Sequence, residues 1–173
     1  MTRAILASAI ACFAVSLAGC AGDPREGYSM GSAFDRRINS VEVRIFDNLS
    51  FNHGMEVLLA DAIVKEIQIQ TPWQVRTGSL AQTTLTGAIT DVRLRARSVA
   101  RETGLVQEQA VEVTLDFQWR DNRSGDVLAS RRGVRAVEIF VPTLGAGERI
   151  EVGQNAAVQE AAREVVAALR SGW

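Results

Sequence analysis

The chain has 173 residues, with 19 Lys and Arg against 20 Asp and Glu, so its formal net charge at pH 7 is −1. This balance excludes a globally basic nucleic-acid binder, although it allows a local basic patch. The single histidine, His53, excludes a multi-histidine metal site and is the one imidazole for a Ser-His-Asp triad. The chain has two cysteines. We therefore expect no metal, no other cofactor and no nucleic-acid partner, and the composition argues against an enzyme.

The N-terminus carries a short apolar run after a positively charged start. Residues 5–17 are apolar or small apart from two serines, and Arg3 precedes them. A membrane-spanning helix needs about 20 apolar residues, so this shorter run is typical of a secretory signal. It ends in Leu17-Ala18-Gly19-Cys20, which resembles a bacterial lipobox, in which the cysteine is acylated and the bond before it is cut. We predict a lipoprotein signal peptide over 1–19 and lipidation of Cys20; the alternative is an ordinary signal peptide with a coincidental cysteine.

Beyond Cys20 the composition changes to glycine, proline and charged residues, which is typical of a flexible tether. We assign residues 20–39 to this tether and residues 40–173 to one domain. Strict alternation over Ser40–Phe46 predicts the first strand, and a break in the pattern predicts a loop over Asp47–Asn52. One face of this strand is expected to carry three apolar side chains, Val41, Val43 and Ile45.

The next apolar pattern has helical spacing. Over Gly54–Gln70 apolar residues recur at i, i+3 and i+4, and Thr71-Pro72 ends the helix because the residue before proline avoids the helical region. A short strand over Trp73–Arg76 follows. Three long strands come next, and then a glycine-containing connection and a second amphipathic helix. Their predicted ranges are 83–100, 111–119 and 127–141 for the strands, 144–153 for the connection and 156–170 for the helix.

The long strands carry further signals. Alternation in the first of them shifts phase near Asp91, which predicts a β-bulge. Turn-forming residues predict hairpin connections at Glu102-Thr103-Gly104 and over Asp121–Asp126. The element order β-α-β-β-β-β-α predicts an α+β two-layer sandwich, with two helices packed on one face of a mainly antiparallel sheet.

Several short motifs occur along the chain in a recognisable order. Gly27-Tyr28-Ser29 follows the cysteine, and Ser40–Val43 leads to Phe46-Asp47-Asn48. Further motifs are Gly54–Leu58, Asp61–Ile63, Leu85–Asp91 and Arg120–Leu128. Together they resemble the LptE-type lipopolysaccharide-assembly lipoproteins over most of the mature chain. The chain departs from that pattern in a longer spacer between Cys20 and Tyr28, and in residues 144–153, which match no family feature.

The resemblance implies a sandwich anchored in the inner leaflet of the outer membrane, on its periplasmic face. It implies the large β-barrel translocon LptD as a partner, and lipopolysaccharide as a ligand. Ala21 stands where many bacterial lipoproteins carry an aspartate that retains them in the inner membrane, which agrees with delivery to the outer membrane. We expect a non-enzymatic outer-membrane lipoprotein that associates with an LptD-like barrel and assists its assembly and lipopolysaccharide delivery.

Alternating arginines on the first long strand are candidates for the contact with lipopolysaccharide. Residues two apart in a strand share a face, and guanidinium groups bind phosphate oxygens in pairs. The predicted glycolipid contacts are Arg93, Arg95, Arg97, Arg131 and Arg135. The alternative is ion pairing within the sheet, because the first hairpin brings Arg95 close to Glu112. Arg131, Arg132 and Arg135 could likewise pair with Asp116 and Glu112.

A few apolar side chains could meet either a partner or the core. Leu49, Phe51 and Met55 cluster around the loop before the first helix, where partner contact and core closure are both open. Trp119 continues the apolar face of its strand and is predicted to be core, whereas Trp73 is compatible with core or interface. His53 is predicted to be a loop or cap residue.

Two other functions remain open from the sequence. One is a lipid-anchored auxiliary or lipid-binding subunit of another envelope transporter, which can share a small sandwich and an anchor. The other is a tethered hydrolase, for which Asp116 and Asp126 are the carboxylates to consider. Strand pairing accounts for Asp116 and turn chemistry for Asp126, so the catalytic inventory of the chain is thin.

Overall fold

The computed structural model describes residues 38–99, 106–141 and 150–171. The predicted signal peptide, Cys20, nearly all of the tether, the turn at Glu102-Thr103-Gly104 and Trp173 lie outside these ranges. The strands are β1 (Ser40–Val43), β2 (Asp47–Asn48), β3 (Gln74–Val75), β4 (Thr83–Val99), β5 (Val106–Asp121) and β6 (Val127–Phe140). The helices are α2 (Met55–Gln70) and α3 (Ile150–Ser171), with a 3₁₀ turn over Gly78–Leu80.

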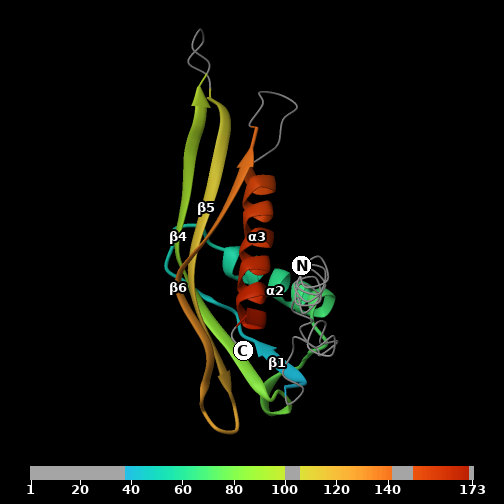
Figure 1. The fold of residues 1–173 in the computed structure, drawn as a ribbon. Helices are drawn as coiled ribbons and strands as arrows, with labels where there is room; N and C mark the ends of the chain where they lie inside the picture. The colour runs from blue at the N-terminus through green and yellow to red at the C-terminus, as the bar shows by residue number, and fades with distance from the viewer. Residues whose placement is uncertain (1–37, 100–105, 142–149, 172–173) are drawn as a thin grey trace, which may run out of the picture. The chain divides into compact units, whose positions relative to one another are not determined.

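These strands form one mixed, mostly antiparallel sheet (Figure 1). Their order is β3-β1-β4-β5-β6, and β2 pairs with β4 beside this path. The long strands β4, β5 and β6 are antiparallel neighbours, whereas β1 runs parallel to β3 and β4, and β2 runs parallel to β4. The predicted α+β fold is confirmed. The parallel pairings were not predicted, because alternation along a strand does not encode the direction of its neighbour.

The strand β5 shows the predicted alternation over residues 111–119. Five of its apolar side chains are buried on the helix side of the sheet: Val111, Val113, Leu115, Phe117 and Trp119. The register of β4 against β5 shifts between Ile89 and Asp91, which confirms the predicted bulge. Because of this shift, Leu85 and Ile89 face the helices before the bulge and Val92 does so after it.

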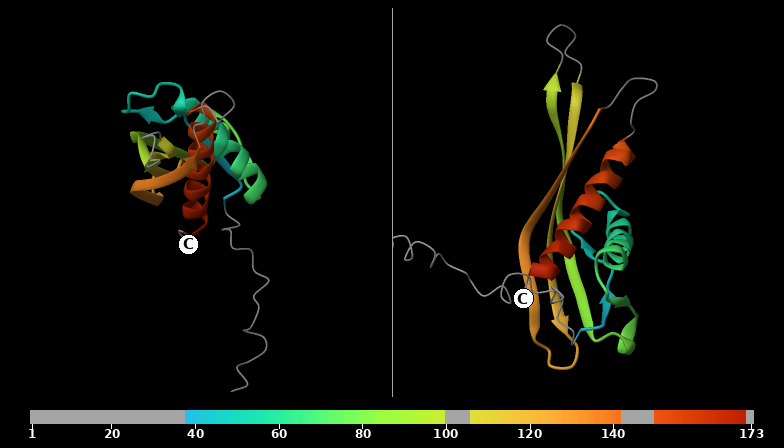
Figure 2. Two further views of the ribbon diagram at one scale, coloured as in Figure 1. Left: turned by 90° about the horizontal axis from the view of Figure 1, so that it is seen from above. Right: turned by 45° about the vertical axis from the view of Figure 1, so that its right-hand side comes forward.

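Both helices lie on the same side of the sheet (Figure 1, Figure 2). The helix α3 packs against β5, β6 and α2, while α2 packs against α3 and the short strands β1, β2 and β3. The predicted core face of α3 is confirmed, since its members are buried: Val158, Ala161, Ala162, Val165 and Leu169. Trp73 and Trp119 are both buried, with ring centroids 4.9 Å apart, so Trp73 belongs to the core.

The first strand ends earlier than predicted. β1 stops at Val43, Ile45 is 64% exposed, and Phe46 is buried instead. The following two residues, expected in a loop, form β2. The ring of Phe46 covers Gly87 of β4, where an added Cβ would lie 2.3 Å from the Phe46 Cε1 atom. Covering this glycine buries a larger apolar side chain than Ile45, which explains why the alternation breaks here.

The helix α3 begins at Ile150, earlier than the predicted start at Ala156. The prediction that Gly153 belongs to a connection is therefore wrong. Gly153 lies in the helix and faces Phe140, whose Cδ1 atom would be 2.5 Å from an added Cβ. The glycine permits a close approach of α3 to β6 and does not mark a turn. The rest of the predicted connection, residues 144–149, lies outside the described residues.

Candidate functional site

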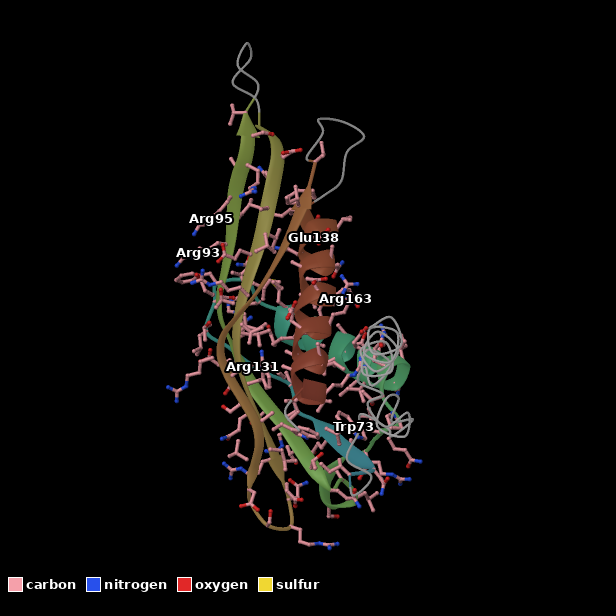
Figure 3. The ribbon with its side chains drawn as sticks, in the orientation of Figure 1. Trp73, Arg93, Arg95, Arg131, Glu138 and Arg163 are labelled. Atoms are coloured by element: carbon pink, nitrogen blue, oxygen red, sulfur yellow. The ribbon has the colours of Figure 1, made fainter. Side chains whose placement is uncertain are left out.

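Arginines of β4 lie on the face of the sheet opposite the helices. Arg93 is registered opposite Glu112, which alternates with buried residues of β5 and so points away from the helices. Arg95 shares this face, and Arg135 reaches it from β6, opposite Thr114. Figure 3 draws Arg93 and Arg95 along β4 on the side away from α3. We call the group Arg93, Arg95, Arg135 and Glu112 the arginine face.

Ion pairs connect the residues of the arginine face. Glu112 forms ion pairs with two of these arginines, with Arg95 Nε 3.5 Å from Oε2 and Arg135 Nε 3.9 Å from Oε1. The predicted pairing of Arg95 with Glu112 is therefore confirmed. Arg93 pairs with Asp91 of its own strand at 2.5 Å between Nε and Oδ2. The arginine side chains stay 56–70% exposed, so these pairs contribute at most about 1 kcal/mol each and leave the guanidinium groups accessible to an anion.

Arg131 does not share this face. The register of β6 against β5 shifts between Leu115 and Phe117, and Arg131 lies opposite Phe117, a position on the helix side. Gly133 adopts φ 63, a conformation open mainly to glycine, and its N–H donates to Asp116 Oδ1 at 2.7 Å. The five predicted arginines therefore do not form one patch, because one extra residue in β6 moves Arg131 to the other side of the sheet.

Arg97 lies at a second irregularity of the β4–β5 ladder. The register shifts between Ala96 and Ser98, so Arg97 has no residue directly opposite. Its side chain is exposed near the far end of β4. Arg97 therefore adds a positive charge beyond the arginine face but does not belong to it.

Two of the three apolar partner-contact candidates are exposed. Leu49 is 71% exposed and Phe51 is 99% exposed, whereas Met55 is buried in the core. His53 is exposed in the turn before α2, as predicted for a loop residue. The segment between β2 and α2 therefore presents Leu49 and Phe51 to solvent, and we call these two residues the apolar tip.

A hydrogen-bond network fixes the segment that carries the apolar tip. Asn48 Oδ1 accepts from Ser50 N at 2.9 Å and Ser50 Oγ at 2.7 Å, and Asn48 Nδ2 donates to Asn52 O at 2.8 Å and Glu56 Oε2 at 2.7 Å. Gly54 N also donates to Glu56 Oε2, at 2.9 Å. The hydrogen bond from the backbone N–H of Glu56, followed by that from Asn48, lowers the pKa of the Glu56 carboxyl. Sequence reasoning missed this network, although Asn and Ser at these spacings are typical of such turns.

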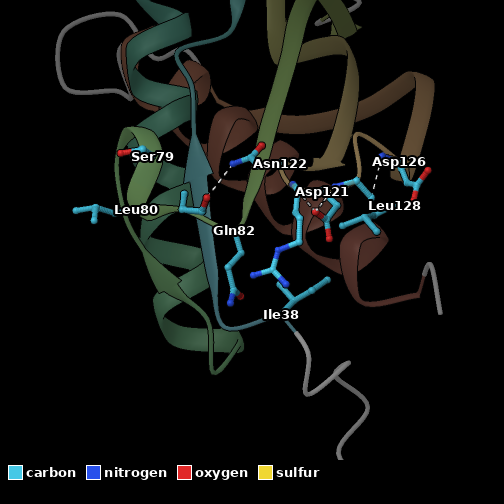
Figure 4. Close-up of a pocket in the computed structure, with 11 residues that line it drawn as sticks. Ile38, Ser79, Leu80, Gln82, Asp121, Asn122, Asp126 and Leu128 are labelled. Carbon is cyan, nitrogen blue, oxygen red and sulfur yellow. Dashed lines mark hydrogen bonds between the residues drawn. The ribbon is translucent and has the colours of Figure 1, made fainter.

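A cleft of about 700 Å³ lies beside the β5–β6 hairpin (Figure 4). Asp121 Oδ1 accepts the N–H groups of Arg123 at 2.7 Å and Ser124 at 3.2 Å. Asn122 Nδ2 donates to Ala81 O at 2.9 Å, which ties the hairpin to the segment before β4. These polar side chains therefore build the predicted turn.

The two carboxylates considered for a hydrolase have different surroundings. Asp126 lines the cleft, whereas Asp116 lies on β5 with its hydrogen bond to Gly133. Within residues 38–99, 106–141 and 150–171, no group of three or more His, Cys, Asp or Glu side chains is arranged to hold a metal ion. Neither described helix has the length and apolar character needed to cross a membrane.

Comparison with known families relates this fold to lipopolysaccharide assembly. A family model described as LptE, lipopolysaccharide-assembly, matches residues 38–169. The match begins before β1 and extends to the last turns of α3, so it covers the sheet, both helices and the arginine face. The chain belongs to the LptE family. The resemblance found in the sequence motifs is thereby confirmed, and the chain falls in a family that acts in assembly of the cell envelope.

Solved structures resemble this LptE-family chain at low sequence identity. A crystal structure of a Xanthomonas campestris protein is 16% identical, covers 79% of this chain and 86% of its own, and has a TM-score of 0.52. Uncharacterised lipoprotein B from Nitrosomonas europaea is 19% identical, with coverage of 78% and 86% and a TM-score of 0.49. A putative lipoprotein from Caulobacter crescentus is 16% identical, with coverage of 73% and 88% and a TM-score of 0.46. The Xanthomonas structure supports the fold alone, and no curated protein matches the chain.

Proposed function

We propose that this LptE-family chain is a lipoprotein, anchored through Cys20 in the inner leaflet of the outer membrane, with its domain on the periplasmic side. It associates with an LptD-like β-barrel translocon, assists the assembly of the barrel and helps to deliver lipopolysaccharide. It acts by contact and not by catalysis. The observation that carries the proposal is the family match over residues 38–169. The lipobox-like ending at Leu17-Ala18-Gly19-Cys20 supports the anchor.

The arginine face supports a direct contact with lipopolysaccharide. Its arginines outnumber the carboxylates that they pair with, and they are more than half exposed. Guanidinium groups bind phosphate oxygens through paired, charge-assisted hydrogen bonds. We propose that Arg93, Arg95 and Arg135 receive the phosphates of the glycolipid. Arg97 lies farther along the same strand and would add to the attraction, whereas Arg131, on the helix side, is left out of this contact.

Binding of purified lipopolysaccharide tests the arginine face. The double variant Arg93→Gln with Arg95→Gln should bind at least tenfold more weakly, because a hydrogen bond to a charged group contributes about 1.5–3 kcal/mol. The control is Arg163→Gln, since Arg163 is an exposed arginine of α3 that is paired with Glu160. Equal affinity of wild type and the double variant, measured with the full chain in mild detergent, would contradict the glycolipid contact.

Co-purification in mild detergent tests the association with the barrel. The full-length lipoprotein, extracted from its own envelope, should bring down one large β-barrel protein, identified by mass spectrometry. Recovery of a transporter complex in place of a barrel would favour the alternative of an auxiliary transporter subunit. Recovery of neither would contradict the proposed function.

A further inference from the structure

Exposed aliphatic side chains of β6 lie beside the arginine face. Val137 is registered opposite Glu112 of β5, which points away from the helices. Ile139, two residues farther along β6, is registered opposite Ala110 and shares this side of the sheet. Val137 is 48% exposed and Ile139 is 50% exposed. We call these two residues the aliphatic stripe.

The stripe belongs to an edge strand. β6 is the last strand in the order of the described sheet, so its outer edge pairs with no other described strand. Edge strands in natural proteins usually carry charges, which prevent pairing with another chain. The first part of β6 has such charges in Arg131, Arg132 and Arg135, whereas the second part carries the aliphatic stripe. Contact with an apolar ligand would remove this exposed apolar surface from water.

Rows of side chains connect the arginine face to the stripe. Ala110 of β5 is registered opposite Arg95 on one side and Ile139 on the other, and the neighbouring row runs from Arg93 to Val137. Adjacent strands lie about 4.8 Å apart, so the two ends of each row are about 10 Å apart at the backbone. Ala110 has only a methyl side chain, so no long side chain stands between Arg95 and Ile139. A molecule bound by the arginines would therefore meet aliphatic side chains next.

The arginines keep hydrogen-bond donors for such a molecule. Glu112 lies 3.5 Å from Arg95 and 3.9 Å from Arg135, which exceeds the usual N–H···O distance of about 2.9 Å. Glu108, the next carboxylate along this side of β5, accepts a hydrogen bond from Ser98 Oγ at 3.3 Å. Both guanidinium groups can therefore donate to phosphate oxygens while Glu112 stays in place.

Two other occupants fit the stripe less well. Antiparallel pairing of two β6 edges centred on Val137 would place Arg135 of one copy opposite Ile139 of the other, so the stripes would not meet. Segments that enter a bilayer surface usually present a broad apolar face with Trp, Phe or Leu. The stripe has two branched aliphatic side chains and no aromatic residue, which suits single chains better than a membrane surface.

We propose that the aliphatic stripe contacts acyl chains of the same lipopolysaccharide molecule whose phosphates bind the arginine face. The bound part of the ligand is then its acylated, phosphorylated end. It lies across β4, β5 and β6, with phosphates at β4 and acyl chains toward the outer edge of β6. The inference rests on the proposed function, because it takes lipopolysaccharide as the ligand, and it adds an apolar subsite to the charged one.

Removal of the acyl chains from the ligand tests this subsite. The full-length lipoprotein in mild detergent should bind intact lipopolysaccharide about tenfold more tightly than the same lipopolysaccharide deacylated with alkali. The double variant Val137→Thr with Ile139→Thr keeps branched side chains but makes them polar. It should lose this preference, with weaker binding of the intact form and unchanged binding of the deacylated form. Equal affinity of wild type for the two forms would overturn the proposal.

A matched pair of substitutions provides the control. Ile45→Thr with Val127→Thr changes the same two residue types at exposed positions outside the arginine face. This variant should keep the wild-type preference for intact lipopolysaccharide. If it loses the preference as the stripe variant does, the effect is not specific to the stripe and the proposal is overturned.

Site-specific photocrosslinking identifies the occupant in the native envelope. A photoreactive amino acid at position 139 of the full-length lipoprotein should form an adduct that an antibody to lipopolysaccharide recognises. Position 127, at the other end of β6, should form no such adduct. An adduct at position 139 with a second copy of the chain, with another protein or with phospholipid, in place of lipopolysaccharide, would overturn the proposal.

Failure of the proposed function would give a different result. In that case the wild-type chain would bind neither form of lipopolysaccharide and would bring down no barrel. If the stripe alone is wrongly assigned, both forms bind equally well, and Arg93→Gln with Arg95→Gln weakens the binding of both. That result would overturn the apolar subsite and leave the glycolipid contact of the arginine face intact.

Discussion

Gly87 lies where β4 passes beneath the ring of Phe46. A Cβ at this position would be 2.3 Å from Phe46 Cε1 and 2.4 Å from the backbone oxygen of Asp116. The ring can rotate or shift, but the strand backbone of β5 cannot move without breaking its ladder. We expect Gly87→Ala to lower the free energy of unfolding by about 1–3 kcal/mol, the usual range for overpacking a core. Urea denaturation measures this change.

The neighbouring Thr86 provides the control for Gly87→Ala. Thr86 is exposed on the same strand, and its hydroxyl donates only one long, solvent-exposed hydrogen bond, to Gln118 O at 3.4 Å. Thr86→Ala should therefore change the unfolding free energy by less than about 1 kcal/mol. If Gly87→Ala is as mild as Thr86→Ala, the close contact of Phe46 with β4 is not a feature of the molecule in solution.

Glu56 makes stability depend on pH in a direction that can be worked out. Hydrogen bonds from its own backbone N–H, Asn48 and Gly54 lower the pKa of its carboxyl in the folded state from the ordinary value of 4.5. The folded state therefore favours the carboxylate, and the resulting stabilisation is present above pH 4.5 and is lost as the pH falls through the lowered pKa. We expect the stability difference between wild type and Glu56→Gln to be larger at pH 6 than at pH 3.

Urea midpoints at the two pH values measure this difference. Asn48→Ala removes one of the hydrogen bonds to Glu56, so the pH-dependent part of the difference should shrink in that background. A Glu56→Gln effect that is the same at pH 3 and pH 6 would show that the carboxylate is not held by these donors.

At the scale of the element, Gly153 determines how closely α3 can approach β6. An added Cβ would be 2.5 Å from Phe140 Cδ1 and 2.9 Å from Cγ. In an open helix Gly→Ala stabilises by up to about 1 kcal/mol. Here we expect Gly153→Ala to destabilise by about 1–2 kcal/mol, because the contact with the ring outweighs the gain in helix propensity.

The sign of the Gly153→Ala effect should reverse once the ring is removed. In a Phe140→Ala background Gly153→Ala should be neutral or stabilising, so the two substitutions form a strongly non-additive pair in urea denaturation. Additive effects would mean that α3 does not pack closely against Phe140 at Gly153.

The sequence was most informative where an element repeats with one period over many residues. The alternation of Val113, Leu115 and Phe117 and the helical spacing of Val158, Val165 and Leu169 each predicted a buried face, because burial forces that periodicity. Both patterns extend over several turns or strand positions, so single exceptions do not obscure them.

Features that depend on tertiary contacts were not predictable in this way. Arg131 lies on the helix side because β6 contains an extra residue at Gly133. The N–H of Gly133 can donate to Asp116 only after β5 and β6 have paired. The parallel pairing of β1 with β4 and the exposure of Ile45 in place of Phe46 likewise depend on neighbours distant in the chain. Of the candidate arginines, Arg93, Arg95 and Arg135 share a face as expected and Arg131 does not. Their contact with a glycolipid stays a prediction.

At the scale of the whole molecule, the proposed contacts differ in kind. Lipid attachment at Cys20 would fix the protein to the membrane without selecting a partner, whereas the arginine face would select a ligand that carries phosphates. The acyl chains expected on Cys20 would hold the protein at the membrane, because each buried methylene contributes about 0.8 kcal/mol.

Substitution of the lipidation site tests this arrangement. Cys20→Ser removes the thiol that the acyl chain requires, so the variant should incorporate no labelled palmitate and should be absent from the outer-membrane fraction. Cys12→Ser is the matched control, because Cys12 lies within the predicted signal peptide and would be removed with it. That variant should be labelled and localised like wild type. If Cys20→Ser still fractionates with the outer membrane and supports lipopolysaccharide assembly as wild type does, contacts of the folded domain alone are sufficient and the lipid anchor has no part in the function.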